Sequence, residues 1–178
     1  KSIKEDAYIV GEAWEGTDKQ IREYYESECD SFFLFTMSAG AGSSSSVKQL
    51  FSPLLSTPGQ KLENLLLGLQ TTYDKGSLAP FLGNHDTARA ANMLASKNLI
   101  KMGAGVMSIM NGNVFVYYGD EIGMVCADTS NDPSKRIPMR WAESDMAEGQ
   151  VFNYKPQGYN GVIDKSLYPN GSVESQKD

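Results

Sequence analysis

The sequence contains few of the residues from which disulfide frameworks and zinc sites are built. Among 178 residues there are 2 cysteines and 1 histidine. Cys29 and Cys126 cannot form a disulfide framework, and we expect two buried free thiols. The single histidine, His85, excludes a zinc site with several histidine ligands inside this chain. We expect no metal site and no cofactor within this chain.

Positive charge and long apolar runs are also scarce. The chain has 16 lysines and arginines against 22 aspartates and glutamates, a formal net charge of -6. Because nucleic acids and anionic membranes are polyanions, this balance argues against either as a partner. No apolar run approaches the ~20 residues that span a bilayer, and residues 1–6 have no apolar stretch of the signal-peptide kind.

The sequence does contain short apolar runs that alternate with helical patterns. The runs are typical of buried strands and occupy residues 8–10, 32–35, 81–82 and 114–118. Capping signals or apolar residues at helical spacing predict helices at about 18–28, 47–54, 62–69 and 87–110. Beyond about residue 125, Pro, Gly, Asn, Asp and Ser dominate and predict loop. The alternation predicts βαβ units, and hence an α/β fold with a parallel sheet.

Polar residues follow the end of each predicted strand. Glu12, Thr36 and Asp120 follow the first, second and fourth strands, and His85 and Asp86 follow the third. The carboxyl ends of parallel strands share one face, which is where ligands bind in α/β folds. Taken singly, Glu12 is better explained as a solvated loop carboxylate, and Asp86 could simply cap the helix expected to begin near residue 87. Their expected convergence favours a functional site.

Two carboxylates on one face, with a histidine beside one of them, suit the cleavage of a glycosidic bond. One acid protonates the leaving oxygen, while a negative charge nearby stabilises the oxocarbenium-like transition state. Trp14, Tyr117 and Tyr118 would offer flat apolar surfaces for sugar rings, although aromatic residues near strand ends are equally common in cores.

Four segments carry a resemblance to a known family. Residues 8–14, Tyr-Ile-Val-Gly-Glu-Ala-Trp, resemble the strand-five motif of glycoside hydrolase family 13, the α-amylase family. Residues 81–86, Phe-Leu-Gly-Asn-His-Asp, are similar to its strand-seven motif, 114–124 to its strand-eight segment and 132–141 to the loop that follows. The resemblance implies that residues 1–178 are the C-terminal half of a catalytic (β/α)8 TIM barrel, strands five to eight with their helices.

The resemblance also implies roles for individual residues. Glu12 would be the general acid/base and Asp86 the transition-state stabiliser, and these two are the predicted catalytic residues. Arg89 would either touch the substrate or hold the carboxylates of the site. The predicted substrate-binding residues are His85, Trp14, Arg89 and Tyr118.

Several parts of the family pattern are missing from this chain. The strand-four aspartate that serves as nucleophile, the strand-three motif, the calcium-binding inserted domain and the C-terminal β domain do not occur in it. We therefore expect the isolated chain to be inactive, and any calcium site to belong to the intact enzyme. An open half-barrel would also expose sheet edges, so we expect self-association.

The implied substrate is starch or a maltooligosaccharide, cleaved at α-1,4 bonds with retention through a glycosyl-enzyme intermediate. Two alternatives stay open. The loop at 135–141 also suits relatives that cut α-1,6 bonds or transfer glucosyl groups, and some relatives are non-catalytic carbohydrate-binding or partner subunits. The sequence fixes no localisation; the outside or the surface of a bacterial cell is the favoured expectation for the intact enzyme.

Overall fold

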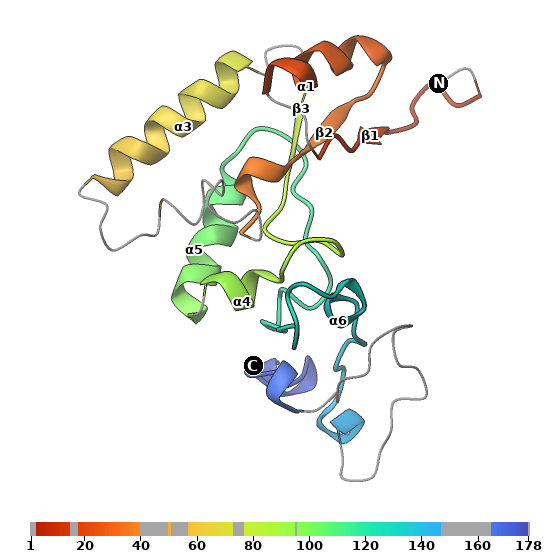
Figure 1. Ribbon diagram of the computed structural model, residues 1–178, viewed down its shortest axis with the longest axis vertical. Coiled ribbons are helices and arrows are strands. Elements are labelled where there is room, and N and C mark those ends of the chain that lie inside the picture. Colours follow the sequence, from red (N-terminus) through yellow and green to blue (C-terminus); the bar gives the residue numbers. More distant parts are fainter. Residues whose placement is uncertain are drawn as a thin grey trace.

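The centre of the computed structural model is a parallel sheet in sequential order. The structure describes residues 3–14, 18–39, 50, 57–72, 77–94, 96–146 and 165–177. The strands β1 (Val10–Gly11), β2 (Ser31–Leu34) and β3 (Ser77–Pro80) follow the order β1-β2-β3, and both neighbouring pairs are parallel (Figure 1). Ser31, Phe32 and Leu34 of β2 are buried, as expected for the middle strand of a sheet.

The third strand lies slightly earlier in the chain than predicted. β3 ends at Pro80, so the predicted strand residues Phe81 and Leu82 come directly after it. A proline inside a strand removes a ladder donor, and the apolar signal of Leu78 and Ala79 is short. Pro80 is tolerated because its carbonyl still accepts a hydrogen bond, from the Phe115 N–H at 2.9 Å.

The predicted fourth strand, 114–118, is present only as a partial pairing with β3. Two isolated parallel bridges join Leu78 to Gly112 and Phe81 to Phe115. Within the described part of the chain, β3 is the only strand that pairs with this segment, so it forms an edge. Val116 is accordingly 69% exposed. We call residues 112–116 the edge segment.

Two of the predicted helices are confirmed with small changes in their bounds. α1 (Asp18–Tyr24) continues into a 3₁₀ turn at Tyr25–Ser27, and α3 (Pro58–Thr72) contains the predicted leucine stripe. Leu69 of that stripe is buried, and the other three leucines, Leu62, Leu65 and Leu66, pack partly buried against the core. The helix predicted at 47–54 lies outside the described residues apart from Leu50.

The single helix predicted for 87–110 is wrong. The structure has α4 (Ala90–Leu94) and a separate α5 (Lys97–Ser108). Ser96 has an extended backbone, and its side chain accepts a hydrogen bond from the Leu99 N–H at 3.1 Å. This N-cap starts a new helix, and the apolar periodicity on either side of it conceals the break.

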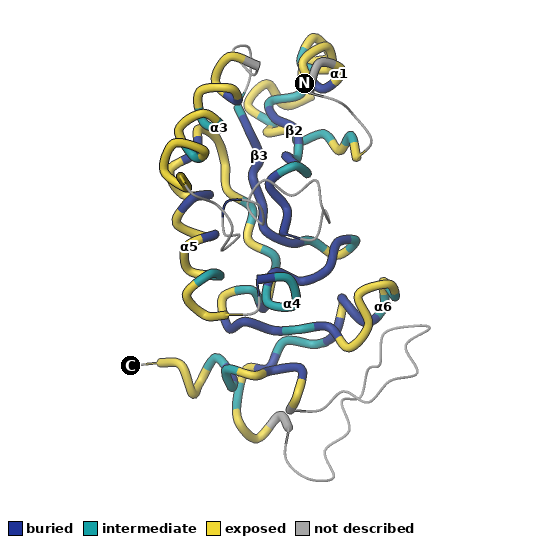
Figure 2. Tube along the Cα trace, turned by 60° about the vertical axis from the view of Figure 1, so that its left-hand side comes forward, coloured by how far each residue is buried: buried dark blue, intermediate teal, exposed yellow. Residues whose placement is uncertain are grey.

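The core lies between the strands and the helices along one side of them. Figure 2 shows buried residues along β2 and β3, and mainly exposed residues on the outer faces of α3 and α5. The later part of the chain packs around a second, smaller apolar cluster, which consists of Ile122, Met124, Ile137, Leu167 and Tyr168. The predicted loop after residue 125 contains α6 (Asp132–Lys135) and 3₁₀ turns at Glu143–Met146, Lys165–Leu167 and Glu174–Gln176.

Both cysteines are free thiols, although only Cys126 is buried and Cys29 is half-buried. The described helices include none that is long and apolar enough to cross a membrane.

Candidate active site

The predicted site residues follow the carboxyl ends of the strands. Glu12 comes directly after β1, His85 and Asp86 follow β3 within a short turn, and Asp120 follows the edge segment. Since the strands are parallel, these ends lie at the same edge of the sheet. Glu12 is exposed, so its carboxyl group is open to a ligand.

A row of aromatic rings connects the strands near this edge. Trp14 packs on Phe35 with ring centroids 4.5 Å apart, and Phe35 packs edge-on against Phe81 at 5.1 Å. Phe33 contacts Phe81 at 5.7 Å and Phe115 at 4.8 Å. These ring contacts hold the segments after β1 and β3 in a fixed relation to the edge segment. About half of Trp14 remains exposed, so a sugar ring could still stack on it.

The turn that carries Asp86 is fixed by its own side chains. The Asn84 carboxamide oxygen accepts hydrogen bonds from the backbone N–H groups of Asp86 (2.9 Å) and Thr87 (2.7 Å). The Thr87 hydroxyl in turn accepts from the Asn84 N–H at 3.0 Å. Asn84 therefore closes this turn, and no helix begins at Thr87 for Asp86 to cap, so the Asp86 carboxylate is available for other contacts.

The Asp86 carboxylate lies between a histidine and an arginine. His85 Nε2 is 3.2 Å from Asp86 Oδ2, and Arg136 Nη2 is 2.6 Å from Asp86 Oδ1. The Asp86 side chain is 28% exposed, so a ligand can still approach it. His85 is more exposed than Asp86. The structure therefore brings His85 and Asp86 together, as their adjacent positions in the sequence predict.

Sequence reasoning missed the contribution of the loop at 132–137, which we call the α6 loop. Arg136 also donates from Nε to the His85 carbonyl at 3.1 Å. The buried Lys135 ammonium donates to the Asp86 carbonyl at 2.7 Å and to Asp132 at 2.8 Å. The hydrogen bond from Lys135 lowers the pKa of the Asp132 carboxyl, with a smaller contribution from Arg136. This loop was recognisable only as a family-like motif, since its partners lie about 50 residues earlier in the chain.

Arg89 is fully buried in this structure. Its guanidinium donates to the Tyr118 carbonyl at 2.7 Å and to the Lys135 carbonyl at 3.1 Å, and it stacks on the Tyr117 and Tyr118 rings. Asp120 Oδ1 is 3.9 Å from Arg89 Nη1. Of the two predicted roles for Arg89, this placement favours holding a carboxylate over touching the substrate.

Asp120 and Tyr118 have different surroundings. The Asp120 side chain is only 8% exposed, and its Oδ1 has no hydrogen-bond partner within the described structure. Burial raises the pKa of Asp120 to about 7, although the positive charge of Arg89 opposes this. Tyr118 is partly exposed, and its hydroxyl donates to the Ile137 carbonyl at 2.8 Å. A sugar could therefore stack on the Tyr118 ring, but it would compete with the Ile137 carbonyl for the Tyr118 hydroxyl.

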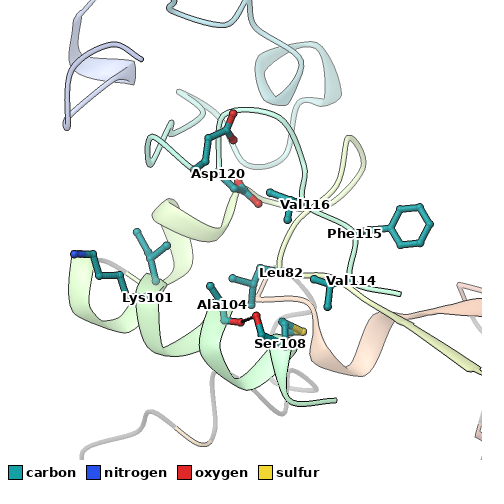
Figure 3. A pocket seen from close by; sticks show the side chains of 11 residues that line it. Leu82, Lys101, Ala104, Ser108, Val114, Phe115, Val116 and Asp120 are labelled. Atoms are coloured by element: carbon teal, nitrogen blue, oxygen red, sulfur yellow. Dashed lines mark hydrogen bonds between the residues drawn. The ribbon is translucent and has the colours of Figure 1, made fainter. Parts of the chain in front are cut away.

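One apolar cavity, of about 300 Å³, lies away from Glu12, His85 and Asp86 (Figure 3). It lies between α5 and the edge segment, lined by Leu82, Lys101, Val114 and Val116 among others, with Asp120 at one end. Glu12, His85 and Asp86 do not line it. Among the described residues, no group of three or more His, Cys, Asp or Glu side chains could hold a metal ion.

Comparison with known proteins connects this geometry to one family. Residues 1–159 match the family described as alpha amylase, catalytic domain. Alpha-amylase 3 of Dictyoglomus thermophilum is 31% identical over 161 residues, which are 90% of this chain and 30% of that protein. A 4-alpha-glucanotransferase of Thermotoga maritima is 35% identical over 102 residues, covering 54% of this chain and 21% of that protein.

The solved structures agree with the sequence relatives. Eubacterium rectale Amy13B superimposes with a TM-score of 0.74 at 33% identity, over 98% of this chain and 33% of that one. An alpha-amylase from H. orenii shares the fold at a TM-score of 0.66 and 24% identity, over 97% of this chain and 32% of that one. The chain thus spans a third or less of the length of these relatives. The predicted fold class, a partial (β/α)8 barrel with a parallel sheet, is confirmed.

Proposed function

Because this chain belongs to the α-amylase family of glycoside hydrolases, we propose that it supplies part of the active site of a retaining α-glucan hydrolase. The proposed substrates are starch and maltooligosaccharides, cleaved at α-1,4 bonds. The observation that carries the proposal is the Asp86 carboxylate, held at the strand ends between His85 and Arg136, at the sheet edge where Glu12 is exposed.

In this proposal Glu12 acts twice. It first donates its proton to the glycosidic oxygen, so that the leaving sugar departs as a neutral alcohol. It then accepts a proton from the water that attacks the glycosyl-enzyme intermediate. The Asp86 anion stabilises the positive charge that develops on the sugar ring between these steps, and His85 binds a sugar hydroxyl. The nucleophilic carboxylate comes from outside these 178 residues, since the family's strand-four motif does not occur among them.

Glucosyl transfer is a second candidate reaction of the same site. It shares the glycosyl-enzyme intermediate, and differs only in that an acceptor sugar replaces water. The Thermotoga maritima relative, named as a 4-alpha-glucanotransferase, favours this alternative at 35% identity. A relative from Thermoactinomyces vulgaris, 29% identical and named neopullulanase 2, keeps open the cleavage of other α-glucan linkages. The non-catalytic subunit alternative is disfavoured by the joint presence of Glu12, His85 and Asp86.

The test is a product analysis with the complete enzyme that contains this chain. We expect it to convert maltoheptaose into shorter maltooligosaccharides whose new reducing ends are first released as the α-anomer, as seen by ¹H NMR. Larger products instead of hydrolysis would assign the transferase reaction. The 178-residue chain alone should release no sugar, because it has no nucleophile to form the intermediate. No change in any α-glucan, or a β-anomer as the first product, would refute the proposal.

Three further expectations accompany this function. The complete enzyme would bind calcium outside this chain, it would act outside or on the surface of a bacterial cell, and the isolated chain would self-associate through its sheet edges. Equilibrium dialysis, cell fractionation and light scattering address them in turn.

A further inference from the structure

We propose that Arg136, at the end of the α6 loop, is a positioning residue that fixes the Asp86 carboxylate for catalysis. This inference rests on the proposed function, in which Asp86 stabilises the transition state. Arg136 lies outside the two sequence motifs that contain Glu12 and Asp86, and reaches Asp86 from 50 residues further along the chain.

The Arg136 guanidinium holds the turn at two points. Nη2 donates to Asp86 Oδ1 at 2.6 Å, and Nε donates to the His85 carbonyl at 3.1 Å. One planar group therefore bridges a side chain and the backbone of the residue before it. This restricts rotation of the Asp86 carboxylate, and its second oxygen is directed toward His85 Nε2 at 3.2 Å.

Arg136 is itself held in place by neighbours in the α6 loop. Asp132 Oδ2 is 3.5 Å from Arg136 Nη2, and Asp132 Oδ1 accepts from the buried Lys135 ammonium at 2.8 Å. Lys135 also reaches the Asp86 carbonyl at 2.7 Å. The backbone of this loop is fixed in turn, because the Lys135 carbonyl accepts from Arg89 and the Ile137 carbonyl from Tyr118.

Two physical effects of Arg136 oppose each other. A cation beside Asp86 weakens the field that the carboxylate exerts on a positively charged transition state, so this effect alone would slow the reaction. Holding the carboxylate in one orientation avoids reorganisation when the charge develops, and this effect speeds the reaction. A misplacement of about 1 Å can cost about 10²-fold in rate. Because Asp86 is partly exposed, solvent weakens the charge effect of Arg136. The effect of Arg136 on the orientation of the carboxylate therefore has the larger influence on the rate.

The chemistry of arginine makes the two effects separable. A lysine at this position would keep the positive charge, but as a point charge it cannot bridge the Asp86 carboxylate and the His85 carbonyl. Because Arg136 is 43% exposed, the space left by Arg136→Ala would also be accessible to guanidinium ions from solution.

The experiment measures kcat and KM for maltoheptaose with four forms of the complete enzyme: wild type, Arg136→Ala, Arg136→Lys and Lys61→Gln. The last removes one positive charge from the exposed face of α3 and is the matched control. We expect Arg136→Ala to lower kcat by about 10- to 100-fold with KM within about threefold of wild type. Arg136→Lys should be intermediate, and Lys61→Gln unchanged. Guanidinium chloride in the tens of millimolar should raise kcat of Arg136→Ala but not of wild type.

Each other outcome overturns the inference in a distinct way. A loss confined to KM would make Arg136 a substrate contact, and a rate increase would show that its charge effect dominates. A lower kcat without guanidinium or lysine rescue would reduce Arg136 to a structural residue. An active wild type with an unaffected Arg136→Ala variant would refute the inference and leave the proposed function standing. A wild type that is inactive on every α-glucan would refute both.

Discussion

Replacing Asp120 with asparagine should make the stability of this chain less sensitive to pH. The buried Asp120 carboxyl has its pKa raised from 3.8 to about 7, chiefly by burial. The folded state therefore keeps a proton that the unfolded state loses as pH rises above 3.8. The contribution of Asp120 to stability is intact below that pH, declines between 3.8 and about 7, and is fully lost above about 7.

The size of the effect follows from the same values. At 1.36 kcal/mol for each pH unit between 3.8 and about 7, ionisation of Asp120 costs on the order of 4 kcal/mol. Asparagine is isosteric with the protonated acid and does not titrate. We expect Asp120→Asn to match wild type near pH 4 and to become more stable by up to that amount near pH 8.

The assay is urea unfolding of both forms between pH 4 and pH 8, followed by tryptophan fluorescence. Asp128→Asn is a contrasting variant, since hydrogen bonds from Ser130 lower the pKa of the exposed Asp128 carboxyl. The stabilisation that the Asp128 carboxylate provides is present above its unfolded pKa and is lost as pH falls through its folded pKa. Asp128→Asn should therefore lower the free energy of unfolding most at neutral pH. A difference between Asp120→Asn and wild type that stays constant with pH, or shrinks as pH rises, would refute the reasoning.

Four other predictions concern the proton donor, α5 and the edge segment. Glu12→Gln in the complete enzyme should slow starch cleavage by roughly 10²-fold. It should slow the formation of the intermediate from a glucosyl fluoride much less, since fluoride departs without a proton. Equal losses of the two pre-steady-state rates would exclude the proton-donor role. Gly112→Ala should destabilise the chain by more than about 1 kcal/mol, because Gly112 has φ +124° and a Cβ would meet the Leu78 carbonyl. Gly105→Ala, with open space inside α5, should stabilise it in the same thermal scan by about 0.5–1 kcal/mol. The isolated chain should self-associate in light scattering, and Val116→Lys should reduce the association if the edge segment is responsible.

The approximate positions of the strands could be predicted from sequence because each apolar run reflects burial. The leucines of α3 are a strong signal for the same reason, since their spacing places them on one face. The break at Ser96 was missed because apolar residues continue at helical spacing on both sides of it. A serine followed three residues later by the first apolar residue of a new stripe was the available signal.

The candidate site was only half predictable. His85 and Asp86 are adjacent in sequence, so their contact required no knowledge of the fold. The contacts of Arg136 with both residues depend on how the α6 loop returns to β3, and no local pattern encodes that path. The burial of Arg89 is likewise a product of packing, because the rings of Tyr117 and Tyr118 cover its guanidinium.

The contacts between the α6 loop and the Asp86 turn also determine where this protein can be recombined with its relatives. Asp86 and the cations that hold it are separated by about 50 residues, all of which lie on the C-terminal side of β3. A chimaera joined before residue 77 would receive the turn and the α6 loop from one parent, with their contacts intact. A junction between α5 and α6 would pair the Asp86 of one parent with the arginine and lysine of another. Gene-shuffling libraries should therefore retain activity more often with junctions ahead of β3 than with junctions between residues 109 and 131.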